Sequence, residues 1–286
     1  MTKSSVNERG LPIAATYSKA WDQLAEIREH AFRVVDESVG EEALEAHGKK
    51  QAPLLLQGLD IQPTDIVLEI GCGVARLGRE VAPHAGEWWG LDVSREMLSI
   101  AEERCAHLEN VRLLLGDGDN LAEIPDNSVD KAYCHAVLIH MDKEDAYRYM
   151  REAHRVIKPG GLFYFDVWNI CDSVGWLRWQ VERKLYRSKA DRPVNRNQFW
   201  TRAEVEVMLR MSGLDIVHLA ETFSIQPVVT KIEDGPGYDD RLREVRGRHA
   251  EGASVLKYGP DDYEYFGAEL RNGLLQHGIE PEEFSE

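Results

Sequence analysis

The stretch that decides the fold is Glu69-Ile70-Gly71-Cys72-Gly73-Val74-Ala75-Arg76-Leu77-Gly78. It follows the short β-branched run Ile66–Ile70, which predicts a strand, and it opens a helical pattern over residues 74–82. Glycines let the backbone pass close to a ligand, and the first amides of a helix offer unpaired hydrogen-bond donors. The stretch therefore predicts a loop that binds a small molecule, and a tight turn without a ligand is the simpler alternative.

The segments around this loop alternate between strand and helix. Further strands are predicted at residues 87–91, 111–115, 129–135, 162–167, 215–220 and 223–229. Helices are predicted within residues 12–58 and at 94–105, 142–157 and 201–213, with Ser94, Asp142 and Thr201 as N-caps. This alternation predicts an α/β fold with a doubly wound, mostly parallel sheet and helices on both faces.

Two neighbours of the loop indicate its ligand. A dinucleotide loop of the pattern G-x-G-x-x-G needs a third glycine at position 76, where this chain has Arg76. Asp92 ends the next predicted strand, and a carboxylate at this place accepts hydrogen bonds from both hydroxyls of a ribose. The pair predicts an adenosine ligand. Because NAD enzymes share this device, a nucleotide-binding oxidoreductase is an alternative that Arg76 disfavours, and Asp92 could also serve only as a helix-flanking carboxylate.

Three further motifs follow in chain order. Leu115-Gly116-Asp117-Gly118-Asp119-Asn120-Leu121 places carboxylates after the third strand, although a plain Gly/Asp turn has the same composition. The segment from Asp126 to Met141 opens with the pattern D-x-S-x-D and ends beside His140. Arg155-Val156-Ile157-Lys158-Pro159-Gly160-Gly161-Leu162 forms a turn before the fifth strand.

In this order and spacing, over residues 65–167, the motifs resemble those of class I, Rossmann-like S-adenosylmethionine-dependent methyltransferases. The resemblance implies a seven-stranded sheet whose last strand is antiparallel, with S-adenosylmethionine as the cofactor. It implies that Glu69 supports the loop and the amino end of the methionine moiety, that Asp92 holds the ribose, and that Asp117 and Gly118 face the adenine. The other residues implied at the cofactor are Tyr17, Gly71, Cys72, Gly73, Val93 and His135. Tyr17 lies in a segment similar to N-terminal Y-D-x-x-A segments, and a core aromatic is its alternative role.

The resemblance also divides the chain into parts. Residues 1–58 are expected to form an N-terminal helical cap, residues 59–232 the cofactor-binding core, and residues 233–286 an acidic, partly helical extension. Residues 172–200 interrupt the core with Trp176, Trp179 and Trp200 among many Lys and Arg residues. We expect a lid over the site for a sugar, an aromatic or an anionic acceptor. An insertion that packs down, or that makes a homodimer contact, is the alternative.

Methyl transfer needs an aligned acceptor and, where the acceptor is a hydroxyl, a base. His140 follows the fourth strand and is the first candidate base, because an ordinary histidine pKa suits the task. His135 is the second candidate, although its register favours the cofactor. Asp166 ends the fifth strand, where it would orient a substrate hydroxyl or help to hold a divalent metal. The histidine spacing matches no zinc signature and the four cysteines form no C-x-x-C pair, so no metal site is predicted.

Composition limits the partners. The net charge of −16 argues against general nucleic-acid binding, and the apolar runs are too short to span a membrane. The polar start Met1–Gly10 lacks the apolar stretch of a secretory signal, so a cytoplasmic location is expected. The sequence thus predicts an enzyme that methylates a small molecule, with a hydroxyl as the preferred acceptor. N- or C-methylation, and a cofactor-binding module without catalysis, are the alternatives.

Overall fold

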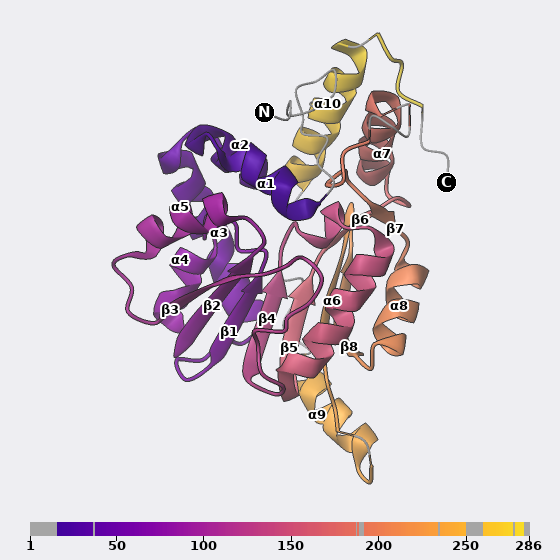
Figure 1. The fold of residues 1–286 in the computed structure, drawn as a ribbon. Coiled ribbons are helices and arrows are strands. Elements are labelled where there is room, and N and C mark those ends of the chain that lie inside the picture. The colour runs from indigo at the N-terminus through magenta and orange to yellow at the C-terminus, as the bar shows by residue number, and fades with distance from the viewer. Residues whose placement is uncertain are drawn as a thin grey trace.

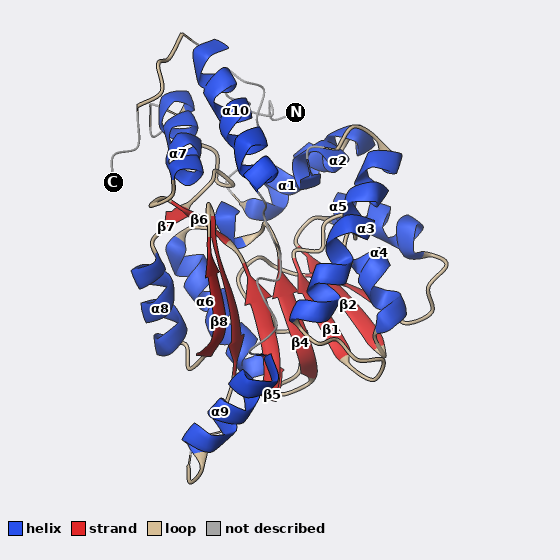
Figure 2. Ribbon diagram, turned by 180° about the vertical axis from the view of Figure 1, so that it is seen from behind, coloured by secondary structure: helices blue, strands red, loops and turns tan. Residues whose placement is uncertain are grey.

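The computed structural model describes residues 16–36, 38–186, 188, 192–233, 235–249, 260–276 and 278–282. The expectation for Met1–Gly10 lies outside these ranges. Within them, helices and strands alternate around a central sheet, and further helices lie beyond one end of its strands (Figure 1). The view from behind shows helices on the opposite face of the same sheet (Figure 2).

The strands of the described residues form one sheet. They are β1 (Ile66–Ile70), β2 (Glu87–Asp92), β3 (Val111–Leu115), β4 (Val129–Cys134), β5 (Ile157–Phe165), β6 (Val167–Asn169), β7 (Phe199–Trp200), β8 (Asp215–Glu221) and β9 (Ser224–Thr230). Their order is β3-β2-β1-β4-β5-β9-β6-β7, and β8 also pairs with β9. The chain reverses its winding direction between β1 and β4, and such a switch point opens a crevice at the carboxyl ends of these strands.

The strand directions confirm the predicted sheet. The pairs β1–β2, β2–β3, β1–β4 and β4–β5 are parallel, whereas β9 runs antiparallel to β5, β6 and β8. The sheet has nine strands instead of the predicted seven. The difference arises because β6 continues the line of β5 beyond Asp166, and because the two residues of β7 pair with β6.

Helices cover both faces of the sheet, as predicted. They are α1 (Tyr17–Ala25), α2 (Arg28–Asp36), α3 (Glu41–Gly58), α4 (Gly78–Val81), α5 (Arg95–Cys105), α6 (Lys143–Val156), α7 (Ser173–Leu185), α8 (Arg202–Met211), α9 (Tyr238–His249) and α10 (Pro260–Gln276). Apolar side chains of α3, α4, α5 and α9 share one cluster with Val67 and Trp88. Those of α6 and α8 share another with Leu68 and Phe163. Neighbouring strand residues such as Val67 and Leu68 thus face opposite layers, as the pleat of a strand requires.

The predicted helix starts agree with the structure at Ser94, Asp142 and Thr201 and differ at Val74. Ser94 caps α5 by accepting the Met97 N–H at 3.2 Å, and Thr201 forms a capping box at α8. Asp142 stands at the N-cap of α6, but its carboxylate makes no cap bond. The predicted helix over 74–82 is shortened to α4 and the 3₁₀ turn Ala82–His84. The glycine loop continues through this region, with Ala75 at a φ of +55°, which is incompatible with a right-handed helix.

Helices extend beyond both ends of the sheet. In Figure 1, α1, α2, α7 and α10 lie beyond the carboxyl ends of the parallel strands, and α9, whose apolar side chains join the layer of α3, α4 and α5, extends past the other end. The expected C-terminal extension is thus divided between the two ends. The expected boundaries at residues 58 and 232 stay predictions.

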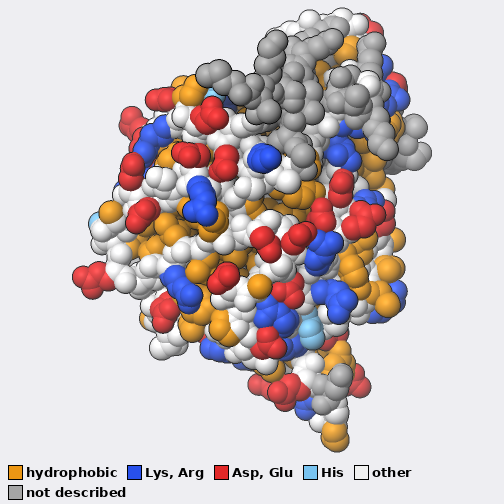
Figure 3. All heavy atoms as spheres, in the orientation of Figure 1, with side chains coloured by type: hydrophobic (Ala, Val, Ile, Leu, Met, Phe, Trp, Pro, Cys, Tyr) orange, Lys and Arg blue, Asp and Glu red, His pale blue; other side chains and the backbone are white. Residues whose placement is uncertain are grey.

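The surface mixes charges of both signs. Figure 3 shows Lys and Arg interspersed with Asp and Glu on one face of the molecule. Among the helices that the structure describes, none combines the length and the apolar character needed to cross a membrane.

Candidate active site

The glycine loop links the end of β1 to α4. Gly71 and Gly73 have φ angles of +72° and +50°, and a Cβ at Gly71 would lie 2.3 Å from Val137 Cγ2. The N–H groups of Gly71 and Cys72 donate to the Leu91 carbonyl at 2.7 and 3.0 Å. The loop is therefore held against β2 in a left-handed conformation that glycine adopts without strain.

Asp92 ends β2 beside this loop. Its Oδ2 accepts the Gly73 N–H at 2.8 Å, and its Oδ1 accepts the Ser94 N–H at 2.9 Å. The carboxyl group is buried, and burial raises its pKa to about 6. Ser94 Oγ also donates to Asp22 of α1 at 2.7 Å, so the N-terminal helices are hydrogen-bonded to the same corner of the site.

Glu69 lies buried behind the loop. Its Oε2 accepts the Tyr133 hydroxyl at 2.7 Å, and the Tyr133 oxygen accepts the Trp88 indole N–H at 3.1 Å. Burial raises the pKa of Glu69 to about 8, while the Tyr133 hydrogen bond and the Arg76 charge act in the opposite direction. A cation that binds beside Glu69 would favour the ionised carboxylate and lower this pKa.

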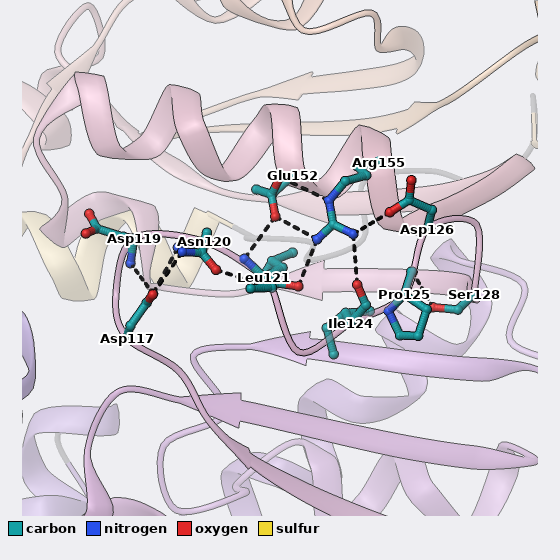
Figure 4. Close-up of polar contacts among 11 residues, drawn as sticks. Asp117, Asp119, Asn120, Leu121, Ile124, Pro125, Asp126, Ser128, Glu152 and Arg155 are labelled. Carbon is teal, nitrogen blue, oxygen red and sulfur yellow. Dashed lines mark hydrogen bonds and ion pairs between the residues drawn. The ribbon is translucent and has the colours of Figure 1, made fainter.

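Asp117 lies in the loop between β3 and β4. Its Oδ1 accepts the N–H groups of Asp119 and Asn120 at 2.8 and 3.1 Å, as Figure 4 shows. These bonds lower the pKa of the Asp117 carboxyl, which is exposed. The following Gly118 has a φ of +87°, and a Cβ there would lie 3.4 Å from Val93 Cγ1. The Asp117 carboxylate is thus already hydrogen-bonded to backbone groups of its own loop.

Arg155 fastens the far side of that loop. Its guanidinium donates to the carbonyls of Leu121 and Ile124 at 2.8 and 2.9 Å and pairs with Glu152 at 2.7 Å (Figure 4). Glu152 in turn accepts the Leu121 N–H at 3.1 Å. The β3–β4 connection contains no helix among the described residues, and the bonds of Arg155 hold it in place. Arg155 therefore has a structural role.

His135 and Asp166 form a buried pair beyond β4 and β5. His135 Nδ1 lies 3.3 Å from Asp166 Oδ1, and the same oxygen accepts the Ala136 N–H at 2.7 Å. A carboxylate beside one ring nitrogen can orient an imidazole. The pair is therefore a second arrangement that can accept a proton.

His140 stands on the 3₁₀ turn Leu138–His140. Its Nδ1 lies 3.0 Å from the Asn195 carbonyl oxygen, which can only accept, so Nδ1 carries the proton and Nε2 the lone pair. Burial lowers the pKa of His140 to about 4, and the charge of Arg178 contributes to the lowering. The ring meets Trp21 of α1 edge to face, with centroids 5.1 Å apart. The imidazole is therefore neutral near pH 7.

Tyr17 connects the N-terminal helices to the start of α6. Its hydroxyl accepts the Asp142 N–H and donates to Asp145 Oδ2, both at 3.0 Å. The Asp142 carboxylate accepts hydrogen bonds from Arg196 and Gln198 at 3.0 and 2.9 Å. The turn before α6 thus anchors two segments that cover the site.

One cavity of about 460 Å³ joins these groups, a volume ordinary for small-molecule sites. The sequence-predicted residues that line it are Tyr17, Glu69, Gly71, Cys72, Gly73, Asp92, Val93, His135 and His140. Asp166 lies behind His135, and Asp117 and Gly118 are not among the lining residues of the described chain.

Toward α7 and α10 the cavity is lined by residues that the sequence did not single out. They include Trp168, Arg178, Val181, Asn197, Phe266 and Leu270. The Trp- and Arg-rich composition of residues 172–200 was the one signal for Arg178. No pattern in the sequence connected α10 with the site.

The strand order, the antiparallel β9, the glycine loop and the acidic end of β2 together define a Rossmann-like methyltransferase fold of class I. Residues 67–161 match a family model described as a methyltransferase domain. The central part of this chain thus matches a methyltransferase domain, and its fold is the Rossmann-like fold of class I methyltransferases.

Curated relatives share the same region. The chain is 36% identical over 112 residues to an uncharacterised 37.1 kDa protein of a Streptomyces fradiae transposon, covering 38% of this chain and 31% of that protein. It is 32% identical over 111 residues to a demethylmenaquinone methyltransferase of Staphylococcus epidermidis, covering 38% and 45%. The chain thus spans less than half the length of these relatives.

A solved structure extends the likeness of the fold. Magnesium protoporphyrin IX methyltransferase from Synechocystis, with bound S-adenosylhomocysteine, aligns with a TM-score of 0.55 at 18% identity. The alignment covers 76% of this chain and 100% of that one.

Proposed function

We propose that this protein transfers a methyl group from S-adenosylmethionine to a hydroxyl group of a small molecule. The observation that carries the proposal is the one cavity that extends from the glycine loop and Asp92, past His140, to α7 and α10. A cofactor and an acceptor that share one enclosed space can be aligned while water is excluded.

The residues at the glycine loop fit the charges of S-adenosylmethionine. Glu69 and Asp92 present buried carboxyl groups that suit an ammonium group and ribose hydroxyls. Arg76 is buried and lines the cavity beside the glycine loop, so its positive charge suits the carboxylate of the methionine moiety. When bound, the cofactor supplies an electrophilic methyl group.

At the adenine end, Val93 lines the cavity and Gly118 lies beside it. The Asp117 carboxylate reaches the adenine only if it leaves Asp119 and Asn120. At the methionine end, Tyr17 closes the cavity from α1. The role proposed for Asp117 therefore requires a change in its loop.

His140 is the proposed base. The hydrogen bond to the Asn195 carbonyl leaves the lone pair on Nε2, and the low pKa keeps the ring unprotonated. The expectation of an ordinary histidine pKa was wrong, because burial makes His140 a weaker base than a free histidine. A base of low pKa serves an acidic hydroxyl, such as a phenol, better than a sugar hydroxyl. His135, oriented by Asp166, is the second candidate.

Other acceptor atoms are the alternatives. The Staphylococcus relative is named for demethylmenaquinone and the Synechocystis structure for magnesium protoporphyrin IX. N- or C-methylation, or cofactor binding without catalysis, would use the same cofactor end of the cavity.

Calorimetric titration tests the cofactor assignment first. We expect S-adenosylmethionine and S-adenosylhomocysteine to bind, NAD not to bind, and Asp92→Ala to abolish binding. Asp239→Ala, an exposed aspartate in the first turn of α9, is the matched control and should bind as the wild type does. A preference for NAD, or no binding of S-adenosylmethionine or S-adenosylhomocysteine, would refute the cofactor assignment.

Turnover tests the acceptor and the base. Radiolabelled S-adenosylmethionine is offered with phenols, sugars, thiols and amines between about pH 6 and about pH 9. His140→Ala should slow methylation of the phenols by about 100-fold or more, with S-adenosylhomocysteine affinity unchanged. Unchanged turnover in this variant would remove His140 as the base, and loss of turnover only in His135→Ala would assign the role to the His135–Asp166 pair.

A further inference from the structure

The cavity end beneath α7 contains a cation that methyl transfer does not require. Arg178 lines the cavity, and its Nε is buried and lacks a hydrogen-bond partner among the described residues. The other end of its guanidinium lies 3.7 Å from Glu182 Oε1, one turn further along α7. This Nε–H is covered by protein, but the Arg178 side chain as a whole is 29% exposed and lines the cavity, so its terminal guanidinium N–H groups are the donors that remain for a ligand.

An aromatic wall lies beside this cation. The guanidinium carbon of Arg178 is 5.8 Å from the centroid of the Trp168 ring. The Trp168 ring packs on Phe223 with centroids 5.8 Å apart, and Phe223 packs on Phe266 at 5.4 Å. Trp168 and Phe266 both line the cavity, so this end offers flat apolar surface next to a positive charge.

Hydrogen bonds hold the wall and the cation in place. The Trp168 indole N–H donates to Asn197 Oδ1 at 3.2 Å, and Asn197 Nδ2 donates to Glu182 Oε1 at 2.6 Å. Glu182 therefore has a second donor besides Arg178. Glu269, the other carboxylate at this end, has an exposed side chain and is solvated. Arg178 consequently keeps its attraction for an incoming anion.

The same cation lies close to the proposed base. His140 and Arg178 line one cavity, and the charge of Arg178 is one cause of the low pKa of His140. A ligand that spans the two would place its anionic group at Arg178 and its opposite end at the imidazole.

We propose that the acceptor is a hydroxylated aromatic carboxylate, with its carboxylate on Arg178, its ring against Trp168 and Phe266, and its hydroxyl toward His140. This inference rests on the proposed function, because it names the substrate class of the same site. A planar guanidinium favours a carboxylate through paired N–H donors, and aromatic side chains favour a planar ring.

Binding of simple probes tests the inference apart from turnover. The full chain is saturated with S-adenosylhomocysteine and titrated with 3- and 4-hydroxybenzoate and with the matching neutral hydroxybenzamides. The hydroxybenzoates should bind at least about tenfold more tightly than the amides. Arg178→Met should weaken hydroxybenzoate binding by about 10- to 100-fold and leave amide binding unchanged. Arg178→Lys, which keeps the charge without the planar donors, should retain part of the preference.

A matched control comes from the same helix. Arg183 of α7 lies over Trp179, with its guanidinium carbon 4.8 Å from the ring centroid, and pairs with Glu282. Arg183→Met should bind every probe as the wild type does. If Arg183→Met and Arg178→Met weaken hydroxybenzoate binding equally, the effect is not local and the inference is refuted.

The outcomes separate this inference from the proposed function. If S-adenosylhomocysteine does not bind, the proposed function fails. If it binds, but the hydroxybenzoates do not bind or bind no better than the amides, the inference about the acceptor fails while the cofactor assignment stands.

Discussion

Replacing Glu69 by glutamine removes one buried charge and changes little else. The two side chains have nearly the same size, and the glutamine oxygen can accept the Tyr133 hydroxyl as Glu69 does at 2.7 Å. In the wild type, burial raises the pKa of Glu69 from 4.5 to about 8. The folded, cofactor-free protein therefore binds this proton more tightly than the unfolded chain does.

The sign of the effect follows from this difference. Stability due to the bound proton is fully present below pH 4.5 and is lost as the pH rises through about 8. A tenfold change in proton affinity corresponds to about 1.4 kcal/mol. Between about pH 5 and about pH 9, the wild type should therefore lose about 3 to 5 kcal/mol of unfolding free energy relative to Glu69→Gln.

Urea unfolding of the cofactor-free proteins across this pH range measures the difference. Other groups titrate in both proteins and largely cancel in the comparison. Glu96→Gln, at an exposed position in the first turn of α5, is the control and should follow the wild type at every pH. If the curves of the wild type and Glu69→Gln run parallel, Glu69 is ionised in the folded protein throughout, and the reasoning from burial is wrong.

Three further substitutions test other parts of the site. Gly71→Ala places a Cβ 2.3 Å from Val137 Cγ2 at a φ of +72°. Calorimetry should show S-adenosylhomocysteine affinity reduced at least about tenfold, with partial recovery when Val137→Ala is added. An unchanged affinity would contradict the loop geometry. Arg155→Met removes the bonds to Leu121 and Ile124 and should lower the unfolding free energy, measured in urea, by about 2 to 4 kcal/mol. Arg243, whose side chain is 74% exposed on α9, is the control, and Arg243→Met should leave the unfolding free energy unchanged. Equal effects of the two substitutions would show that Arg155 does not hold the loop in place. Gly175→Ala brings a Cβ within 1.7 Å of the Asn169 carbonyl oxygen, so α7 must shift. Binding of hydroxybenzoate should weaken while S-adenosylhomocysteine affinity is kept. If the affinities for both ligands fall together, the packing of α7 does not act on the acceptor end alone.

Features encoded by neighbouring residues could be predicted from the sequence. The glycine loop, the strands and the caps Ser94 and Thr201 depend on residues a few positions apart, so their periodicity and composition are sufficient. The parallel sheet followed from their alternation, because strands separated by helices run parallel. The number of strands could not be predicted, since β6 and β7 are short segments whose pairing partners are distant in the sequence.

Features that depend on distant residues were not visible in the sequence. Asp142 has the composition of a helix cap, yet its carboxylate binds Arg196 and Gln198, which come from a later segment. Arg178 and Phe266 carry no local pattern that would place them in one cavity. The helix over 74–82 was predicted too long because helical periodicity does not reveal the left-handed conformation of Ala75.

The turn at Asp142 has a consequence for binding equilibria. Its N–H is bonded to Tyr17 beneath the N-terminal helices, and its carboxylate to Arg196 and Gln198, which precede β7. Tyr17 lines the end of the cavity proposed for the cofactor, whereas Asn195 and Asn197 border His140 at the end proposed for the acceptor. One residue therefore contacts segments at both ends of the cavity. Such an arrangement provides a short route for thermodynamic coupling, and coupling is reciprocal. The factor by which the cofactor improves acceptor affinity must equal the factor by which the acceptor improves cofactor affinity, and Asp142→Ala would reduce both together.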